Sequence, residues 1–192
     1  APAAVQDARC ALHWVGAHSE RFGFDRRRIV VSGTSAGGHL ALMAGLLPSA
    51  NDIDADECKG GPKAAAILDF YGPADLTLLH GRRRHPTIAN WIGNGPGAAA
   101  MERNMSPVTW LAPDSPPIFI GHGDADPVVP IEQSNDLKRR LDALGLPSDL
   151  FVVAGAGHGK FAPANQSAMT VRVLAFLCAR GILSSAACGT KN

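Results

Sequence analysis

The stretch that decides the fold is Ile29-Val30-Val31-Ser32-Gly33-Thr34-Ser35-Ala36-Gly37-Gly38, followed by the apolar run His39-Leu40-Ala41-Leu42-Met43-Ala44. Its β-branched beginning predicts a short strand, and the run after it predicts a helix. Between them lies a Gly-x-Ser-x-Gly turn, which places a serine hydroxyl at the tip of a sharp strand-to-helix turn. We expect Gly33 and Gly37 to let strand and helix approach closely, because neither carries a Cβ. Ser35 is therefore a candidate nucleophile, and the alternative is a serine that only caps the helix.

Length and charge limit the classes of protein that fit this sequence. The chain has 192 residues, of which 46% are hydrophobic, and this is enough for one domain with a substantial core. The 18 Lys and Arg nearly balance the 17 Asp and Glu, which argues against nucleic acid or an anionic membrane as a partner. The one basic run, Arg82-Arg83-Arg84-His85, is short and is expected to be a solvated face. No apolar run is long enough to span a bilayer.

Strand-like and helix-like segments alternate along the chain. We expect strands at about residues 28–32, 64–71, 117–121 and 150–153, and helices at about 5–22, 36–47, 132–144 and 165–180. The strands are apolar with little polar alternation, which predicts an α/β fold with a mostly parallel sheet and helices on both faces. In the last helix, the residues expected to be buried are Val171, Leu174, Ala175 and Leu177.

Residues 74–115 are irregular and rich in Gly, Pro and Arg. We expect short helices near residues 86–93 and 98–104, and we interpret the segment as a lid-like or specificity insertion in a single catalytic domain spanning residues 1–192. Trp91, Trp110 and Met101 are candidates for lining a pocket there, with core packing as the alternative.

Two later strand ends carry side chains that suit a catalytic triad with Ser35. Asp126 lies in the segment 122–130, and His158 lies in Gly155-Ala156-Gly157-His158-Gly159. A serine hydroxyl needs a base within hydrogen-bond reach, and an imidazole base needs a carboxylate to fix its tautomer. Since active residues collect at the carboxyl ends of parallel strands, we expect the three to meet. Asp124 fits a turn-forming role better.

The other histidines are given smaller roles. His39 is expected to form a local hydrogen bond, with at most a minor role in the pocket, and His122 to support the loop that carries the acid. The histidines expected at the surface are His13, His18, His80 and His85.

The four cysteines show no C-x-x-C pair and no metal-ligand spacing with histidine, so we predict no metal site. Cys10 and Cys178 lie in apolar helical surroundings and are expected to be small buried side chains. Cys58 and Cys188 lie in polar segments and are the candidate disulfide pair. That disulfide would favour a secreted protein, and without it a cytoplasmic location stays open.

Several segments together resemble the α/β-hydrolase superfamily, and most of all its bacterial esterase/lipase branch with feruloyl- and acetylxylan-esterase-like enzymes. The segments are residues 33–41, 122–130 and 155–159, together with Tyr71-Gly72-Pro73-Ala74-Asp75-Leu76 and Ser106-Pro107-Val108. The resemblance runs from about residue 5 to residue 183. It implies Ser35 as nucleophile, Asp126 as acid and His158 as base, and we expect Tyr71 and Trp91 to bind substrate. The implied reaction is acyl transfer from a small ester to water through an acyl-enzyme, without cofactor or metal.

The chain also departs from that family. The family has several strands before the first helix, and a His-Gly-Gly-Gly-type loop that supplies part of the oxyanion hole; neither is visible here. The visible oxyanion donor is the backbone N–H of Ala36, with Gly37 as a possible helper. We therefore expect an N-terminally shortened fold whose strand at 29–32 is an open apolar edge. Such an edge favours a homo-oligomer or pairing with a missing N-terminal portion.

Two further functions stay open at this point. One is a serine peptidase of the prolyl-oligopeptidase type, and the other is a catalytically weak hydrolase-like module without a complete oxyanion hole.

Overall fold

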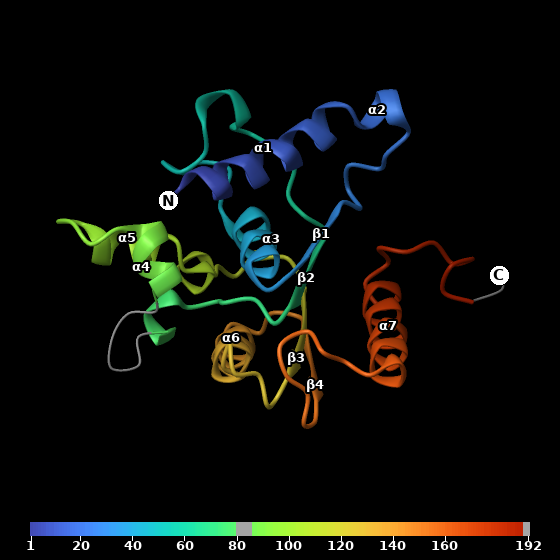
Figure 1. Cartoon of the computed structure of the whole chain (residues 1–192). Coiled ribbons are helices and arrows are strands. Elements are labelled where there is room, and N and C mark those ends of the chain that lie inside the picture. Colours follow the sequence, from blue (N-terminus) through green and yellow to red (C-terminus); the bar gives the residue numbers. More distant parts are fainter. Residues whose placement is uncertain (80–85, 190–192) are drawn as a thin grey trace.

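The computed structural model describes residues 1–79 and 86–189 (Figure 1). In this part of the chain, one sheet is formed by β1 (Val30–Thr34), β2 (Ala66–Phe70), β3 (Ile118–Gly123) and β4 (Ser148–Val153). Neighbouring strands are all parallel, and their order across the sheet is the order along the chain. The predicted parallel sheet is confirmed. The carboxyl ends of the strands consequently share one rim, where functional side chains of such sheets collect.

Helices cover both faces of the sheet. Figure 1 shows α3 and α6 on one face and α7 on the other, with α1 packed outside α3. The helical bounds are α1 (Ala3–Ala17), α2 (Ser19–Phe22), α3 (Ala36–Leu46), α4 (Pro86–Ile92), α5 (Ala98–Asn104), α6 (Glu132–Ala143) and α7 (Pro163–Cys178). Short 3-10 turns occupy Asp56–Cys58, Leu76–Leu79 and Pro107–Trp110.

The core is split by the sheet into two apolar layers. Ile67 and Ile120 pack with α3 and α6, whereas Leu68 and Phe119 pack with α7. Successive residues of a strand point to opposite faces, so an unbroken apolar run fills both layers. This explains why β2 and β3 are apolar except at Asp69 and His122 and are almost wholly buried.

Two helices differ from the expectation. The helix predicted over residues 5–22 is broken at His18 into α1 and α2, and Phe22 is 48% exposed. The predicted buried face of α7 is wrong except at Leu177, because Val171, Leu174 and Ala175 are exposed. Its buried residues are Met169, Phe176 and Leu177. Apolar residues lie on most sides of this helix, so the spacing alone does not select one face.

β1 is an edge strand among the described residues, as expected. Val30 and Val31 are only half-buried, whereas the central strand β3 is buried throughout. The outer side of β1 thus offers unpaired backbone groups beside partly exposed valines.

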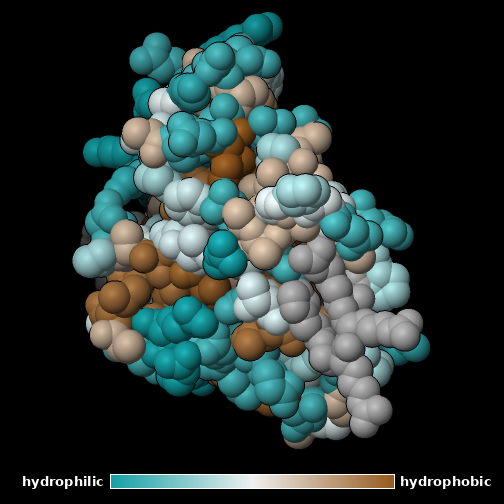
Figure 2. All heavy atoms as spheres, turned by 90° about the vertical axis from the view of Figure 1, so that its left-hand side faces the viewer, coloured by the Kyte–Doolittle hydropathy of each residue, from teal (hydrophilic) through white to brown (hydrophobic). Residues whose placement is uncertain are grey.

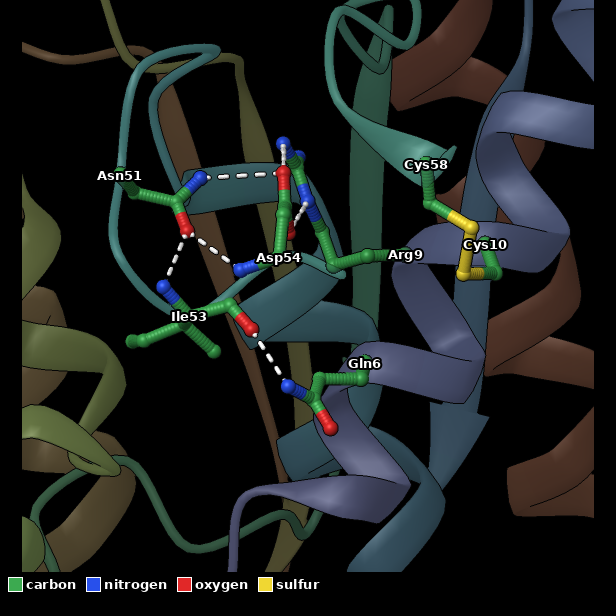
Figure 3. Close-up of a disulfide and its surroundings, with 7 residues drawn as sticks. All are labelled: Gln6, Arg9, Cys10, Asn51, Ile53, Asp54 and Cys58. Carbon is green, nitrogen blue, oxygen red and sulfur yellow. Dashed lines mark hydrogen bonds and ion pairs between the residues drawn. A yellow bond between two sulfur atoms is a disulfide. The ribbon is translucent and has the colours of Figure 1, made fainter. Parts of the chain in front are cut away.

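The disulfide prediction is wrong. The bonds join Cys10 to Cys58 and Cys178 to Cys188, and neither Cys10 nor Cys178 is a free buried side chain. Figure 3 shows the first disulfide beside contacts that hold the same loop against α1. Arg9, on the same turn of α1 as Cys10, donates two hydrogen bonds to Asp54, at 2.8 and 2.7 Å, and this draws the loop after α3 onto α1.

The polar contacts around Arg9 extend through that loop. Asn51 donates to Asp54 and accepts from the N–H groups of Ile53 and Asp54, while Gln6 donates to the Ile53 carbonyl (Figure 3). The loop that brings Cys58 to Cys10 is therefore held at several points.

In the second disulfide, Cys178–Cys188, the residues after α7 fold back onto the end of the helix.

Of the predicted irregular segment, the structure describes residues 74–79 and 86–115, with α4 and α5 at the expected places. Leu76, Ile88 and Met105 pack against Met43 and Leu47, so the segment has its own apolar contact with α3. Figure 2 looks onto the side where α4 and α5 lie, and hydrophobic patches are visible there between hydrophilic residues.

The Arg82-Arg83-Arg84-His85 run and His80 lie outside the described residues. In the described part, no helix is long and apolar enough to cross a bilayer.

Candidate active site

Ser35 stands at a strained turn between β1 and α3. Its backbone has φ 53° and ψ −122°, a conformation that L-residues rarely adopt outside functional turns. The Ser35 N–H donates to the Phe70 carbonyl at 2.9 Å, and the Ser35 carbonyl accepts from the His39 N–H at 3.1 Å. The side chain makes no capping hydrogen bond, so the reading of Ser35 as a mere helix cap is wrong.

The two glycines of the turn are not equivalent. A Cβ at Gly33 would collide with the backbone of Gly37, whereas a Cβ at Gly37 would meet nothing within 4 Å. Of these two glycines, the close approach of strand and helix therefore depends on Gly33.

A chain of hydrogen bonds links the three residues singled out in the sequence. Ser35 Oγ donates to His158 Nε2 at 2.7 Å, and His158 Nδ1 donates to Asp126 Oδ2 at 2.7 Å. These residues come from the ends of β1, β3 and β4. The structure thus brings together side chains up to 123 positions apart in the sequence.

Asp126 is held in the ionised form by its hydrogen bonds. Burial by itself would raise its pKa, but bonds from His158 and from the backbone N–H groups of Val129 and Val128 outweigh burial and place the pKa below its usual value. Its Oδ1 accepts both backbone bonds, which leaves Oδ2 for the imidazole. This carboxylate is therefore both charged and aimed at His158.

His122 supports this loop from inside the core, as expected. Its Nε2 donates to the Val129 carbonyl at 2.9 Å and lies 3.3 Å from Asp126 Oδ2. Its Nδ1 accepts from the Ser134 hydroxyl at 2.6 Å, a partner on α6 that sequence reasoning missed. Burial lowers the pKa of His122, so a neutral ring holds the turn between β3 and α6.

Asp124 has a different task from Asp126. Its carboxylate accepts from the Gly155 N–H at 2.6 Å and so ties the loop after β3 to the loop after β4. The expected role is that of a turn former, and the bond found is instead one between two loops.

A cavity of about 380 Å³ opens beside Ser35. Its wall is mostly apolar and combines α3, the 74–115 segment and the loop after Asp126. The lining residues are Ala4, Ser35, Ala36, His39, Leu40, Pro73, Leu76, Leu79, Thr87, Ile88, Trp91, Val128 and Val129. Trp91 is thus in the cavity wall. Met101 packs in the core beneath the segment, and Trp110 packs there while also lining a second cavity of about 370 Å³.

His39 is a buried, neutral part of this wall. Its Nδ1 donates to the Pro73 carbonyl at 3.0 Å, and its ring meets Trp91 edge-on with 5.5 Å between ring centroids. Burial lowers the pKa of His39 to about 4, against a smaller opposing effect of the bond to Pro73. The local hydrogen bond expected for His39 is present.

Tyr71 lies behind the imidazole and is absent from the lining of the cavity. Its ring centroid is 4.8 Å from that of His158, at an interplanar angle of 69°. Its backbone has φ 47°, a second strained position beside Ser35. A direct contact between Tyr71 and substrate stays a prediction.

Ala36 is the first residue of α3 and lines the cavity. The first N–H groups of a helix have no acceptor within it, so the N–H groups of Ala36 and Gly37 remain as donors at this point. Among the described residues, no group of three or more His, Cys, Asp or Glu side chains is arranged to hold a metal ion.

Gln133 joins the cavity wall to α6 and was not singled out from the sequence. Its side-chain oxygen accepts from the N–H groups of Ala74 and Asp75, and its side-chain nitrogen donates to the Asp75 carbonyl, all at 2.8 Å. A glutamine in an amphipathic helix gives no sign of such a role.

Residues 1–141 match the family model described as BD-FAE. The chain belongs to the BD-FAE family. The matched range contains Ser35 and Asp126, and His158 lies beyond it.

Curated relatives of this BD-FAE chain are named as ester hydrolases. It is 33% identical over 145 residues to the probable carboxylic ester hydrolase LipM of Mycobacterium tuberculosis, covering 73% of this chain and 34% of that protein. It is 29% identical over 180 residues to esterase LipC of the same organism, covering 82% of this chain and 41% of that protein. The chain therefore spans about a third to two-fifths of the length of these relatives.

Solved structures similar to the BD-FAE chain are esterases with the α/β-hydrolase fold. The apo form of esterase 2 from Thermogutta terrifontis matches with a TM-score of 0.77 and 28% identity, over 94% of this chain and 66% of that one. A truncated carbohydrate esterase from gut microbiota matches with a TM-score of 0.71 and 27% identity, over 88% and 67%. The Thermogutta enzyme has also been solved phosphorylated by paraoxon.

Proposed function

We propose that this chain carries the catalytic centre of a serine carboxylesterase that cleaves small carboxylic esters through an acyl-enzyme. The observation that carries the proposal is the hydrogen-bonded series from Ser35 through His158 to Asp126. Such a series supplies a nucleophile, a base and an acid in one line. The names of the relatives, which are ester hydrolases, support the same reaction class.

In the acylation step, Ser35 Oγ attacks the carbonyl carbon of the ester while its proton moves to His158 Nε2. Asp126 keeps the proton on Nδ1 and stabilises the imidazolium that forms. The carbonyl oxygen becomes an oxyanion, for which the Ala36 N–H is the proposed donor. His158 then returns the proton to the ester oxygen as the bond to the carbonyl carbon breaks, and the alcohol leaves.

In the deacylation step, water takes the place of the alcohol. His158 removes a proton from the water as its oxygen attacks the acyl carbon of the Ser35 ester. The second tetrahedral intermediate collapses, the proton goes to Ser35 Oγ, and the carboxylic acid is released.

The cavity suggests the kind of substrate. Its wall is mostly apolar, and the polar side chains in it are Ser35, Thr87 and a neutral His39. A wall without charge favours an uncharged acyl or alcohol group, and about 380 Å³ suits a small one. Trp91 is the proposed substrate contact from the 74–115 segment, which we propose is a specificity element.

We also propose that the open edge of β1 is covered in solution, either by a second copy of this chain or by an additional N-terminal portion. The support is the unpaired side of β1 and its half-buried valines. Light scattering tests the first case, since a stable monomer over a wide concentration range would rule out the homo-oligomer.

The reaction is tested with a fluorophosphonate probe and p-nitrophenyl acetate. We expect the probe to label the folded chain at Ser35, and Ser35→Ala to lose both labelling and hydrolysis. Ser32→Ala is a matched control, because Ser32 is an exposed serine of β1 outside the cavity wall. Hydrolysis by Ser35→Ala at the rate of the unaltered chain would overturn the proposal.

The same experiment separates the alternative functions. A folded chain that no probe labels would favour the catalytically weak module, in which one oxyanion donor does not suffice. Faster cleavage of peptide amides than of matched esters would favour the peptidase.

A further inference from the structure

We infer that Asp69 is a positioning residue for the reaction, because its buried carboxyl group braces both strained residues of the site, Ser35 and Tyr71. This inference rests on the proposed function of Ser35. Asp69 does not touch the cavity, and nothing in the sequence marks it beyond an acid within an apolar strand.

Asp69 lies directly beneath the nucleophile turn. In β2 it is paired with Gly33 of β1 on one side and with Ile120 of β3 on the other. The next residue, Phe70, provides the carbonyl that accepts the Ser35 N–H. Asp69 is 0% exposed, so its side chain is enclosed on all sides by the elements that carry the site.

The carboxyl group fills the space between α3 and the loop after β2. A Cβ at Gly38 or at Gly72 would collide with Asp69 Oδ1. Gly38 is in the first turn of α3, three residues after Ser35. The same Oδ1 accepts the Gly72 N–H at 3.0 Å, which closes a turn over Tyr71 and holds it at φ 47°. One oxygen atom therefore lies between Gly38, three residues after the strained Ser35, and Gly72, the residue after the strained Tyr71.

Among the described residues that adjoin Asp69, none offers a positive charge to its ionised form. The titratable groups on the adjoining elements are His39 on α3, Tyr71 after β2 and His122 on β3, and burial lowers the pKa of both histidines. β1 contributes Ser32, Gly33 and Thr34, which do not titrate. Oδ2 has no hydrogen-bond partner among the described residues. Burial accordingly raises the pKa of Asp69 to about 8, against the smaller opposing effect of the Gly72 N–H.

Ionisation of Asp69 has a structural consequence. A buried carboxylate without a counter-charge must gain water or move outward, since leaving it unpaired costs several kcal/mol. Either response shifts Gly38 and Gly72, and with them Ser35 and Tyr71. Hydrolysis should therefore fail as the pH rises above about 8.

The test compares the chain with Asp69→Asn, which keeps the shape and the acceptor for Gly72 but cannot ionise. Between about pH 7 and pH 9.5, we expect kcat for phenyl acetate to fall roughly tenfold in the unaltered chain, reversibly and with a midpoint near 8. Asp69→Asn should keep most of its kcat over the same range. Asp142→Asn, an exposed aspartate of α6 paired with Lys138, is the control and should follow the unaltered chain.

Three outcomes would overturn the inference: an unaltered chain without the alkaline fall, an equal fall in Asp69→Asn, or a folded Asp69→Asn with little activity at pH 7. A second measurement needs neither activity nor a variant. In the unaltered chain labelled with ¹³C-aspartate, one carboxyl resonance should titrate between about pH 7 and pH 9, and titration of every aspartate below about pH 5 would overturn the inference. If Ser35→Ala hydrolyses esters like the unaltered chain, the proposed function fails while this titration still decides the state of Asp69.

Discussion

The ring of Tyr71 meets the imidazole of His158 edge-on, with 4.8 Å between the ring centroids. Phe161 packs edge-on against the other side of the same tyrosine at 5.7 Å. His158 sits on a glycine-rich loop, so this aromatic contact restricts where its ring can go. From this contact we propose that Tyr71 orients the imidazole of His158, whereas Trp91 lies in the cavity wall.

Replacing Tyr71 separates orientation from substrate binding. We expect Tyr71→Ala to lower kcat roughly ten- to a hundredfold with little change in KM, since small misplacements of a catalytic group have effects of this size. Tyr71→Phe keeps the ring and should stay within about threefold of the unaltered chain. Steady-state kinetics with a soluble ester checks both variants. A rise in KM without a fall in kcat would instead make Tyr71 a substrate contact.

Asp126→Asn should remove most of the activity without unfolding the chain. An amide at this position leaves the imidazole in the wrong tautomer, which in a comparable triad costs on the order of 10⁴ in kcat. The matched control is Asp124→Asn in the same loop. Asp124 holds only the Gly155 N–H, so this variant should lose less than about tenfold. Equal losses in the two variants would contradict the assignment of the acid.

Trp91→Ala should change which acyl group is preferred. The side chain forms part of the cavity wall, so removing it enlarges the space for the substrate. We expect the ratio of kcat/KM for hexanoate over acetate esters to rise about tenfold or more. Trp14→Ala, at an exposed tryptophan of α1, is the control and should leave the ratio unchanged. An unchanged ratio in Trp91→Ala would place the acyl group elsewhere.

The pH dependence of stability should show two opposing buried groups. Folding lowers the pKa of His39 from 6.5 to about 4, so its effect on the unfolding free energy increases with pH up to about 6.5. Folding raises the pKa of Asp69 from 3.8 to about 8, so its effect decreases with pH over that whole range. His39 and Asp69 each change the unfolding free energy by about 1.4 kcal/mol per pH unit, with opposite signs. Their two contributions therefore cancel between about pH 4 and pH 6.5.

Above pH 6.5 only the Asp69 slope remains. Because burial also lowers the pKa of His122, urea unfolding should show a stability that does not fall between about pH 5 and pH 6.5, and then a loss of about 2 kcal/mol by pH 8. In Asp69→Asn, stability should instead increase up to about pH 6.5 and then stay level. A loss above pH 6.5 that persists in Asp69→Asn would assign it to another group.

The two disulfides should differ in their effect on stability. Cys10–Cys58 closes a loop with a sequence separation of 48, and Cys178–Cys188 one with a separation of 10. The loop-entropy model gives about 4 kcal/mol for the first and about 2.7 kcal/mol for the second. Urea unfolding of the Cys10→Ser/Cys58→Ser and Cys178→Ser/Cys188→Ser variants measures both. A larger loss in the second variant would show that packing, rather than loop closure, dominates.

The meeting of Ser35, Asp126 and His158 could be predicted because chemistry and topology agree at each position. Each residue type is one that ester cleavage requires, and each follows a strand of a parallel sheet. The buried face of α7 could not be predicted, since Val171 and Leu174 are as apolar as Phe176 and only the position of the helix on the sheet selects among them.

Other features depend on contacts that local sequence does not display. Four cysteines allow three complete pairings, and the observed one follows from the Arg9–Asp54 ion pair that folds the loop onto α1. In the sequence, Asp69 is only an acidic residue within an apolar strand. Its proposed positioning role could not be predicted, because it depends on contacts with Gly38 and Gly72 that only the folded chain brings about. The role of Ser134 likewise requires the approach of α6 to His122.

The strands follow one another across the sheet in the order in which a ribosome makes them. Ser35 is therefore in place long before its base: 123 residues separate it from His158, which is roughly ten seconds or more of synthesis. A nascent chain in this interval holds an ordinary, unreactive alcohol. Under the proposed function, Ser35 can act as a nucleophile only after the loop that follows β4 has brought His158 within hydrogen-bond reach.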